Sequence, residues 1–99
     1  YLVGFAGHDV RCTPYATFGT PELAQLAREG MKGRFAVLLG NHGLLAAGPN
    51  MHYAFNVAEE IEFVCELYWR SKAVGDPVLI DAGDMETVLE KFKTYGQRD

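Results

Sequence analysis

The segment 37–48, VLLGNHGLLAAG, places one histidine, His42, between two apolar runs. The runs 35–39 and 44–47 are continuous and of strand length, so we expect two buried strands joined by a tight connection. Rigid strands on both sides would hold the imidazole in a fixed place, as a metal ligand or a catalytic group must be held. This segment therefore predicts both the centre of the fold and a candidate functional residue.

Two interpretations of His42 remain open on residue type alone. A histidine at a strand end is more often a hydrogen-bonded structural residue than a metal ligand, and a catalytic zinc site needs three protein ligands. The sequence contains no HxH or HExxH spacing, and we expect His8 and His52 to be a solvated loop residue and a helix-start residue. Gly40 and Gly43 favour a functional His42, because they would leave room for a substrate or a second chain.

The remaining elements follow from hydrophobic spacing and capping signals. Before the two central strands we expect a buried strand over 1–6, a short extended piece around 10–12, and a helix capped by Thr20 that ends at Gly30. After them we expect a long helix capped by Asn50 that ends at 75–77. A final helix is capped by Asp84 and runs through Phe92. Helices that alternate with short strands predict a layered α/β fold. We expect its sheet to need further strands, upstream of this chain, to be covered properly.

Composition excludes several classes of protein. The chain has 99 residues, is 48% hydrophobic and has a net charge of −4, with no basic run of the kind that follows a phosphate backbone, so nucleic acid is not expected as a partner. No apolar segment reaches the ~18–20 residues of a membrane span, so no membrane partner is expected. Cys12 and Cys65 lack metal-site or disulfide spacing, which favours reduced thiols and a cytoplasmic location. The apolar start without Met suggests part of something longer.

Three stretches resemble the class II aldolase/adducin family: CTPYATFGTPEL (12–23), LLGNHGL (38–44) and LEKFKTYG (89–96). The central motif is shared across that superfamily, while the first and last are similar to the branch that cleaves L-fuculose 1-phosphate. The resemblance covers residues 1–99 as the carboxyl-terminal portion of a single domain, with the amino-terminal portion absent. It implies a three-layer α/β/α fold around a central, mostly antiparallel sheet.

The resemblance also implies roles for single residues. His42 matches the third ligand of a catalytic Zn²⁺, and Tyr1 matches a catalytic tyrosine that exchanges a proton with the aldehyde oxygen in the neighbouring subunit's site. Phe18, Phe92 and Tyr95 match substrate-binding residues on the aldehyde side of the pocket. The implied reaction is zinc-dependent cleavage to dihydroxyacetone phosphate and L-lactaldehyde, by a homotetramer with sites between subunits. The 99 residues alone are expected to be inactive, because the other ligands and the general base lie upstream in the family.

Simpler interpretations stand beside these. A tyrosine at a strand start is usually a packing residue, and Phe92 also fits the apolar stripe of its helix. Arg11 departs from the small or apolar residue expected before the cysteine, and the sequence assigns it no role. Within the superfamily, a ribulose-phosphate 4-epimerase, a dehydratase or a noncatalytic adducin-like assembly protein remain alternatives to an aldolase.

Overall fold

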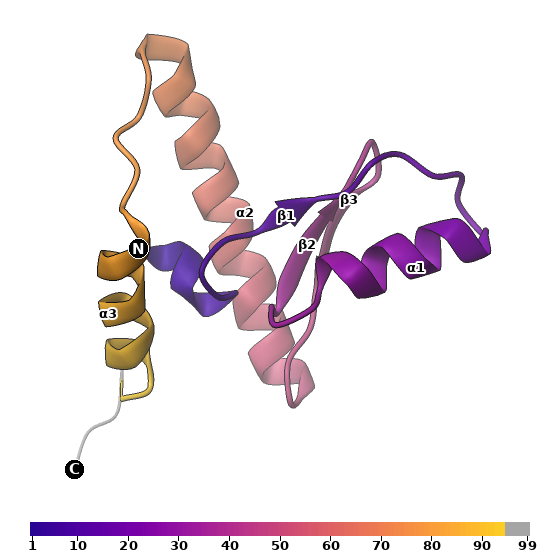
Figure 1. Ribbon diagram of the computed structural model, residues 1–99, viewed down its shortest axis with the longest axis horizontal. Helices are drawn as coiled ribbons and strands as arrows, with labels where there is room; N and C mark the ends of the chain where they lie inside the picture. Colours follow the sequence, from indigo (N-terminus) through magenta and orange to yellow (C-terminus); the bar gives the residue numbers. More distant parts are fainter. Residues whose placement is uncertain (95–99) are drawn as a thin grey trace.

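A computed structural model describes residues 1–94 of the chain (Figure 1). Its elements are a 3₁₀ helix η1 (Leu2–Phe5), β1 (Arg11–Cys12), α1 (Pro21–Gly30), β2 (Ala36–Leu39), β3 (Gly43–Ala46), α2 (Met51–Val74) and α3 (Ala82–Phe92). The two central strands, α1 and α2 lie within one or two residues of where hydrophobic spacing predicts them, and α3 begins three residues earlier than predicted.

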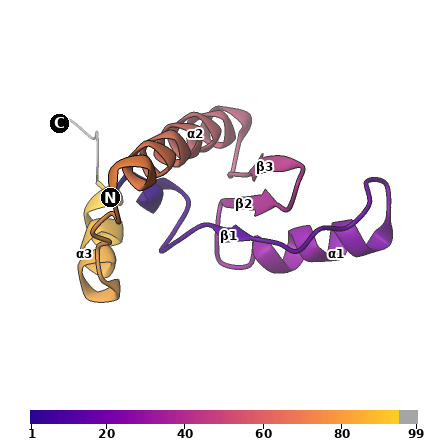
Figure 2. The same cartoon turned by 90° about the horizontal axis from the view of Figure 1, so that it is seen from above.

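The strands form a small mixed sheet in the order β1-β2-β3. β1 pairs with β2 in parallel over two residues, and β2 pairs with β3 antiparallel over four, from Ala36 opposite Ala46 to Leu39 opposite Gly43. Figure 2 shows α2 on one side of this sheet and α1 on the other. The arrangement is therefore three-layered, as expected, and the larger part of its strand pairing is antiparallel.

β2 is the centre of the core because both of its faces are covered. Ala36 and Val37 are fully buried although they point to opposite faces of the strand. Ala36 belongs to the main cluster with Ala6, Val57 and Ile61, which joins β2 to α2. Val37 packs on the other side against Gly30, the last residue of α1, where an added Cβ would lie 2.5 Å from the Val37 side chain.

Helix capping confirms two of the three predicted starts. The hydroxyl of Thr20 accepts from the Leu23 N–H, and Asn50 Oδ1 accepts from the Tyr53 N–H at 2.8 Å. The third prediction was wrong: α3 is capped by Asp81, whose carboxylate accepts from the Asp84 N–H at 2.8 Å. Asp84 lies in the first turn, where an acidic side chain suits the helix dipole, and this made it resemble a cap.

The predicted strand at 1–6 is also wrong. The segment forms η1, with the Gly4 N–H donating to Tyr1 O at 2.9 Å and the Ala6 N–H to Val3 O at 2.8 Å. An apolar run without clear period fits any element that is covered on several sides. η1 lies against both α2 and α3, and a Cβ on Gly4 would be 2.6 Å from the Phe92 ring, so glycine permits this close packing.

Arg11, to which the sequence assigns no role, connects β1 to the end of α1. Its Nη1 donates to the carbonyl oxygens of Lys32 at 2.7 Å and Gly30 at 3.1 Å, with a longer contact of 3.4 Å to Glu29 O. The last carbonyls of a helix have no partner within the helix, and a cation there also suits the dipole. Arg11 therefore caps α1 from a neighbouring strand.

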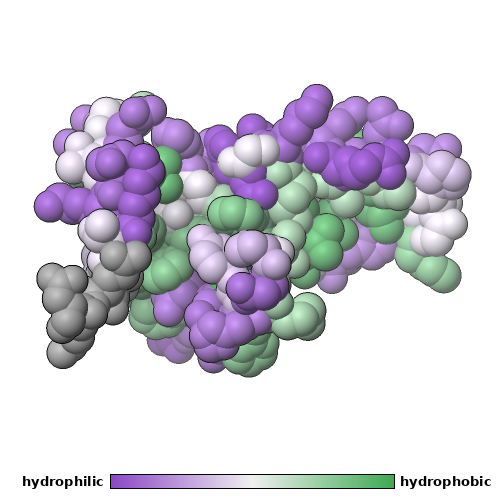
Figure 3. All heavy atoms as spheres, turned by 90° about the horizontal axis from the view of Figure 1, so that it is seen from below, coloured by the Kyte–Doolittle hydropathy of each residue, from purple (hydrophilic) through white to green (hydrophobic). Residues whose placement is uncertain are grey.

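Much apolar surface stays open on this chain. Met51, Phe55 and Trp69 on α2 are 84%, 62% and 70% exposed. Figure 3 shows apolar residues at the surface among hydrophilic ones on one face of the molecule. Within residues 1–94, no helix is long and apolar enough to cross a membrane.

Candidate active site around His42

The turn between β2 and β3 holds His42 in a defined backbone position. The His42 N–H donates to Leu39 O at 2.9 Å, which closes a four-residue turn. Asn41 has φ of +64° within it, a conformation that asparagine tolerates better than most residues. Gly43 follows with φ of +140°, where an L side chain would be strained. The NHG stretch is thus a turn whose residue types suit its dihedral angles.

The exposed imidazole of His42 is held by the segment that follows β1. Nε2 lies 2.8 Å from Ala16 O, and the ring stacks on Tyr15 with centroids 5.5 Å apart and planes 17° apart. A carbonyl oxygen only accepts, so Nε2 carries the proton in this bond, and in the neutral ring Nδ1 then holds the lone pair. Within residues 1–94 the hydrogen bond of the imidazole is made by Nε2, so Nδ1 is the nitrogen that no such bond occupies.

Residues 13–16 are joined to the turn at further points. The Thr13 N–H donates to Leu38 O at 2.8 Å, and the buried Thr13 hydroxyl accepts from the Gly40 N–H at 3.2 Å. A Cβ on Gly40 would lie 2.5 Å from Thr13 O, so the expectation that Gly40 leaves room for a substrate is wrong. The space beside Gly40 is filled by the chain's own backbone, whereas beside Gly43 it is open.

An open groove of about 780 Å³ runs from Tyr15 and Ala16 along α1. Its helical wall includes the carboxylates of Glu22 and Glu29. Carboxylates repel a phosphate dianion, so this groove does not suit the phosphate of a sugar phosphate. We therefore centre the candidate site on the turn rather than on the groove.

Tyr1 and Phe92 lie together, away from the turn. Their rings meet edge to face at 6.4 Å, and Phe92 packs against Phe5 at 4.7 Å. Tyr1 is 63% exposed, while Phe92 is half-buried. Within this chain Phe92 therefore packs against Tyr1 and Phe5, as the packing interpretation expects. Tyr1 itself remains accessible.

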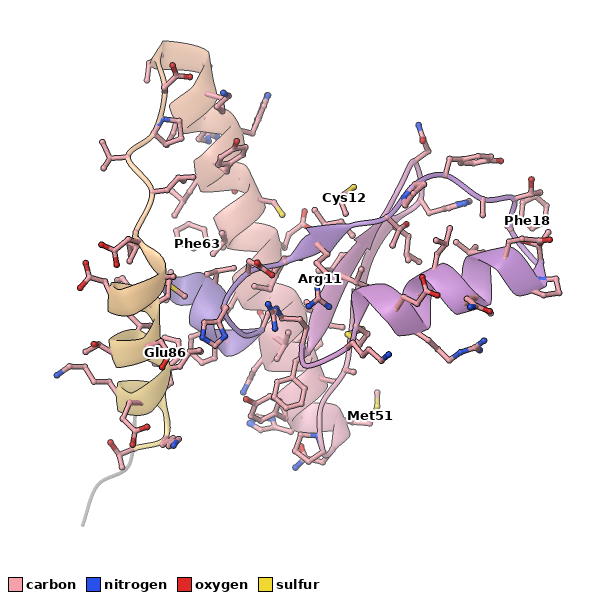
Figure 4. The ribbon with its side chains drawn as sticks, viewed as in Figure 1. Arg11, Cys12, Phe18, Met51, Phe63 and Glu86 are labelled. Carbon is pink, nitrogen blue, oxygen red and sulfur yellow. The ribbon has the colours of Figure 1, made fainter. Side chains whose placement is uncertain are left out.

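The other predicted substrate-binding residues lie elsewhere. Phe18 is 78% exposed in the loop before α1, on the far side of the molecule from α3 and its Glu86 (Figure 4). Tyr95 lies outside the described residues. Figures 1 and 2 agree that the amino terminus lies beside α3, well separated from the turn between β2 and β3. The structure therefore brings Tyr1 and Phe92 together, but not with His42.

A catalytic zinc site would be only partly supplied by these residues. Across residues 1–94 there is no group of three His, Cys, Asp or Glu side chains that could hold a metal. His8 pairs with Glu86 at 3.2 Å, and His52 lies 3.4 Å from Asn56 Nδ2. His42 suits one ligand position, since the residue is exposed and Nδ1 makes no hydrogen bond among the described residues.

The sequence alone does not indicate Tyr15, Ala16 or Thr13 as partners of His42. All three fall within the CTPYATFGT stretch, which carries the family resemblance but no signal of contact with His42. Their relation to His42 depends on the parallel pairing of β1 with β2, because this pairing brings the end of β1 beside the turn. Only a prediction of strand order would have found them.

Residues 1–69 match the family described as Class II Aldolase and Adducin N-terminal domain. The chain belongs to this family. It is 53% identical over 98 residues to a 5-deoxy-D-ribulose 1-phosphate aldolase of Bacillus thuringiensis serovar kurstaki, covering 99% of this chain and 46% of that protein. It is 43% identical over 100 residues to an L-fuculose phosphate aldolase of Escherichia coli K12, again covering 99% and 46%.

The fold comparison agrees. A solved structure described as L-fuculose 1-phosphate aldolase matches with a TM-score of 0.91 and 48% identity, covering 94% of this chain and 44% of the matched one. This match confirms the expected aldolase-like fold. The chain spans about half the length of the curated relatives that it matches.

Proposed function

We propose that this chain contributes to a zinc-dependent class II aldolase, a carbon–carbon lyase, that cleaves L-fuculose 1-phosphate to dihydroxyacetone phosphate and L-lactaldehyde in the cytoplasm, as a step of fucose degradation. The observation that carries the proposal is the accessible imidazole of His42, on a turn closed by the hydrogen bond from His42 N–H to Leu39 O. The likeness to two kinds of ketose 1-phosphate aldolase supports the reaction class.

We propose further that residues 1–99 act as the carboxyl-terminal portion of one such domain. The chain matches less than half of each relative's length, which leaves room in those proteins for other ligands and a general base. On this proposal the 99 residues alone are inactive, because His42 is one ligand and a catalytic zinc takes three from protein.

Zn²⁺ at His42 would polarise the substrate carbonyl as a Lewis acid and stabilise the negative charge that develops on its oxygen. The chain's own contribution there is geometric. The turn closed by His42 N–H and Leu39 O sets the position of the backbone, and the hydrogen bond between Nε2 and Ala16 O holds one edge of the ring. A ligand held in this way needs little reorganisation when it binds a cation.

The separation of Tyr1 from His42 fits a site shared between subunits of a homotetramer. In this proposal His42 and Phe18 of one subunit face Tyr1, Phe92 and Tyr95 of another. The accessible phenol of Tyr1 would exchange a proton with the aldehyde oxygen within hydrogen-bond reach. The aromatic side chains would accept the aldehyde's methyl group and exclude water. A monomer with undiminished activity would contradict this arrangement.

A second substrate is favoured by a specific observation. The relative at 53% identity acts, by its name, on 5-deoxy-D-ribulose 1-phosphate. Cleavage of that sugar phosphate would use the same groups and release a smaller aldehyde. Measuring kcat/KM for both sugar phosphates side by side would decide which of them is the preferred substrate.

The test replaces His42 by Ala in the active protein that carries this chain, with His52→Ala as the matched control. We expect His42→Ala to lose bound zinc and cleavage of both sugar phosphates, while His52→Ala keeps both. Affinity for zinc should also weaken on acidification, because ligation needs a neutral imidazole. A His42→Ala protein that retains parental zinc content and cleavage rate would remove His42 from the site.

A further inference from the structure

Tyr15 is the aromatic residue that contacts His42, and neither the fold nor the proposed reaction assigns it a role. Tyr15 is 58% exposed as a residue, so burial in a core does not explain its position. Its plane lies within 17° of the imidazole plane at a centroid distance of 5.5 Å. Stacking of this kind fixes the plane of a ring, and it does so whichever nitrogen points toward a ligand.

The hydrogen bond to Ala16 complements the stack. It holds one edge of the imidazole at 2.8 Å from a backbone carbonyl, but a single bond leaves the ring free to tilt about that contact. The Tyr15 ring opposes this tilt. Both contacts come from adjacent residues, so a shift in this short segment would move them together.

That segment is itself fixed to the turn that carries His42. Thr13 bonds to Leu38 O and accepts from the Gly40 N–H, and the lack of a side chain on Gly40 lets the two backbones touch. The position of Tyr15 relative to His42 is thus set by contacts that do not involve either ring. This is the arrangement expected of a support that orients a ligand.

We propose that Tyr15 is a positioning residue, whose ring stacks on His42 and orients its imidazole for the cation of the proposed site. The part of this inference that concerns a cation rests on the proposed function. The aromatic face, rather than the hydroxyl, orients the imidazole, since the contact seen is between rings. Phenylalanine at position 15 should therefore retain this role, and leucine should lose it.

The first experiment measures the imidazole without metal. The chain has three histidines, so ring-labelled His42 can be assigned in NMR spectra by its loss in His42→Gln. We expect the ring protons of His42 to move in Tyr15→Leu, because they leave the ring current of Tyr15, and to stay near their original positions in Tyr15→Phe. The His52 protons should not move in either variant.

The second experiment measures zinc affinity in the active protein. Loss of a group that orients a metal ligand typically weakens metal binding about 10–100-fold. We expect about 10-fold weaker binding in Tyr15→Leu, parental binding in Tyr15→Phe, and recovery in Tyr15→Trp, which restores an aromatic face. Amide spectra of β2 and β3 that match the parent would show that the fold is retained; if Tyr15→Leu unfolds, the Phe and Trp variants still decide whether any aromatic face suffices.

The outcomes separate this inference from the proposed function. Zinc bound through His42 with equal affinity in the parent and Tyr15→Leu would overturn the role of Tyr15 and leave the aldolase proposal standing. A parent that binds no zinc would overturn the aldolase proposal, while the shift of the His42 ring protons would still decide whether Tyr15 orients the imidazole. Loss of affinity in Tyr15→Phe as large as in Tyr15→Leu would overturn the claim that the aromatic face acts.

Discussion

The hydroxyl of Thr13 accepts a hydrogen bond from the Gly40 N–H at 3.2 Å, across 27 residues of sequence. The same hydroxyl donates to Pro14 O at 3.0 Å, so both of its hydrogen-bonding functions are used. Thr13 is 9% exposed, which limits the water that could replace either partner. This contact joins the end of β1 to the turn that carries His42.

Replacing Thr13 by Val should destabilise the fold by about 1–2 kcal/mol, because the partly buried Gly40 N–H would lose its acceptor while the side-chain shape is kept. Thr13→Ser is the control, since it keeps the hydroxyl and loses one methyl group. Urea unfolding measures the free energy of both variants. A valine variant as stable as the parent would show that the hydrogen bond contributes nothing.

Gly40 provides a second test of the same contact. An alanine Cβ at this position would lie 2.5 Å from Thr13 O and 3.1 Å from the Pro14 carbonyl carbon, so the backbones must separate. We expect Gly40→Ala to destabilise the fold by about 1–3 kcal/mol, in the range of overpacking, and to shift the His42 ring resonances.

The matched control for Gly40 is Gly83, in the first turn of α3. An added Cβ there has only Asp81 Oδ1 nearby, at 3.5 Å, so Gly83→Ala should be neutral or stabilising by up to about 1 kcal/mol. Thermal unfolding compares the two variants. Equal effects of the two alanines would mean that contact with the 13–16 backbone is not what requires glycine at 40.

The parts of the fold that could be predicted are those with a strong local signal. β2 and β3 are apolar runs separated by a turn that contains Asn41, and both Asn41 and Gly43, the first residue of β3, have positive φ. α2 has a cap at Asn50 and a stop at Gly75, where the Gly75 N–H bonds to Ser71 O. In these segments local preference and tertiary packing favour the same structure.

The parts of the fold that the sequence predicts wrongly, or not at all, depend on contacts between residues that are distant in sequence. η1 is helical because it fits between α2 and α3, and nothing within residues 1–6 indicates those neighbours. Arg11 looks unexplained in sequence because its partners are backbone carbonyls at the end of α1. For the candidate site, His42 could be proposed from its turn and its motif, but its contacts with Tyr15 and Ala16 required strand order.

The capping of α3 distinguishes two neighbouring acids. Asp81→Ala should remove the acceptor for the Asp84 N–H and cost about 1 kcal/mol, whereas Asp81→Asn should keep most of the cap. Asp84→Ala should cost only a few tenths, through the helix dipole, and this smaller loss should fade at high salt. Hydrogen exchange of the α3 amides is the measurement. An equal loss of protection in Asp81→Ala and Asp84→Ala would contradict the assignment of Asp81 as the cap of α3.

The two thiols should differ in how their reactivity depends on pH. Burial, and to a lesser extent the charge of Glu62, raises the pKa of the Cys65 thiol. Because the thiolate is the reactive form, Cys65 should react with a disulfide reagent more slowly than the exposed Cys12 at mildly alkaline pH, and its rate should keep rising to higher pH. The folded state holds this proton more tightly than the unfolded one, so its contribution to stability is present below the unfolded pKa and is lost as pH rises through the folded pKa.

Glu62→Gln removes the smaller cause of the raised pKa, so this variant should speed modification of Cys65 without changing the rate at Cys12. Peptide mapping after timed labelling of Cys12→Ser and Cys65→Ser measures each rate separately, and a Cys65 that reacts as fast as Cys12 across the pH range would contradict the raised pKa.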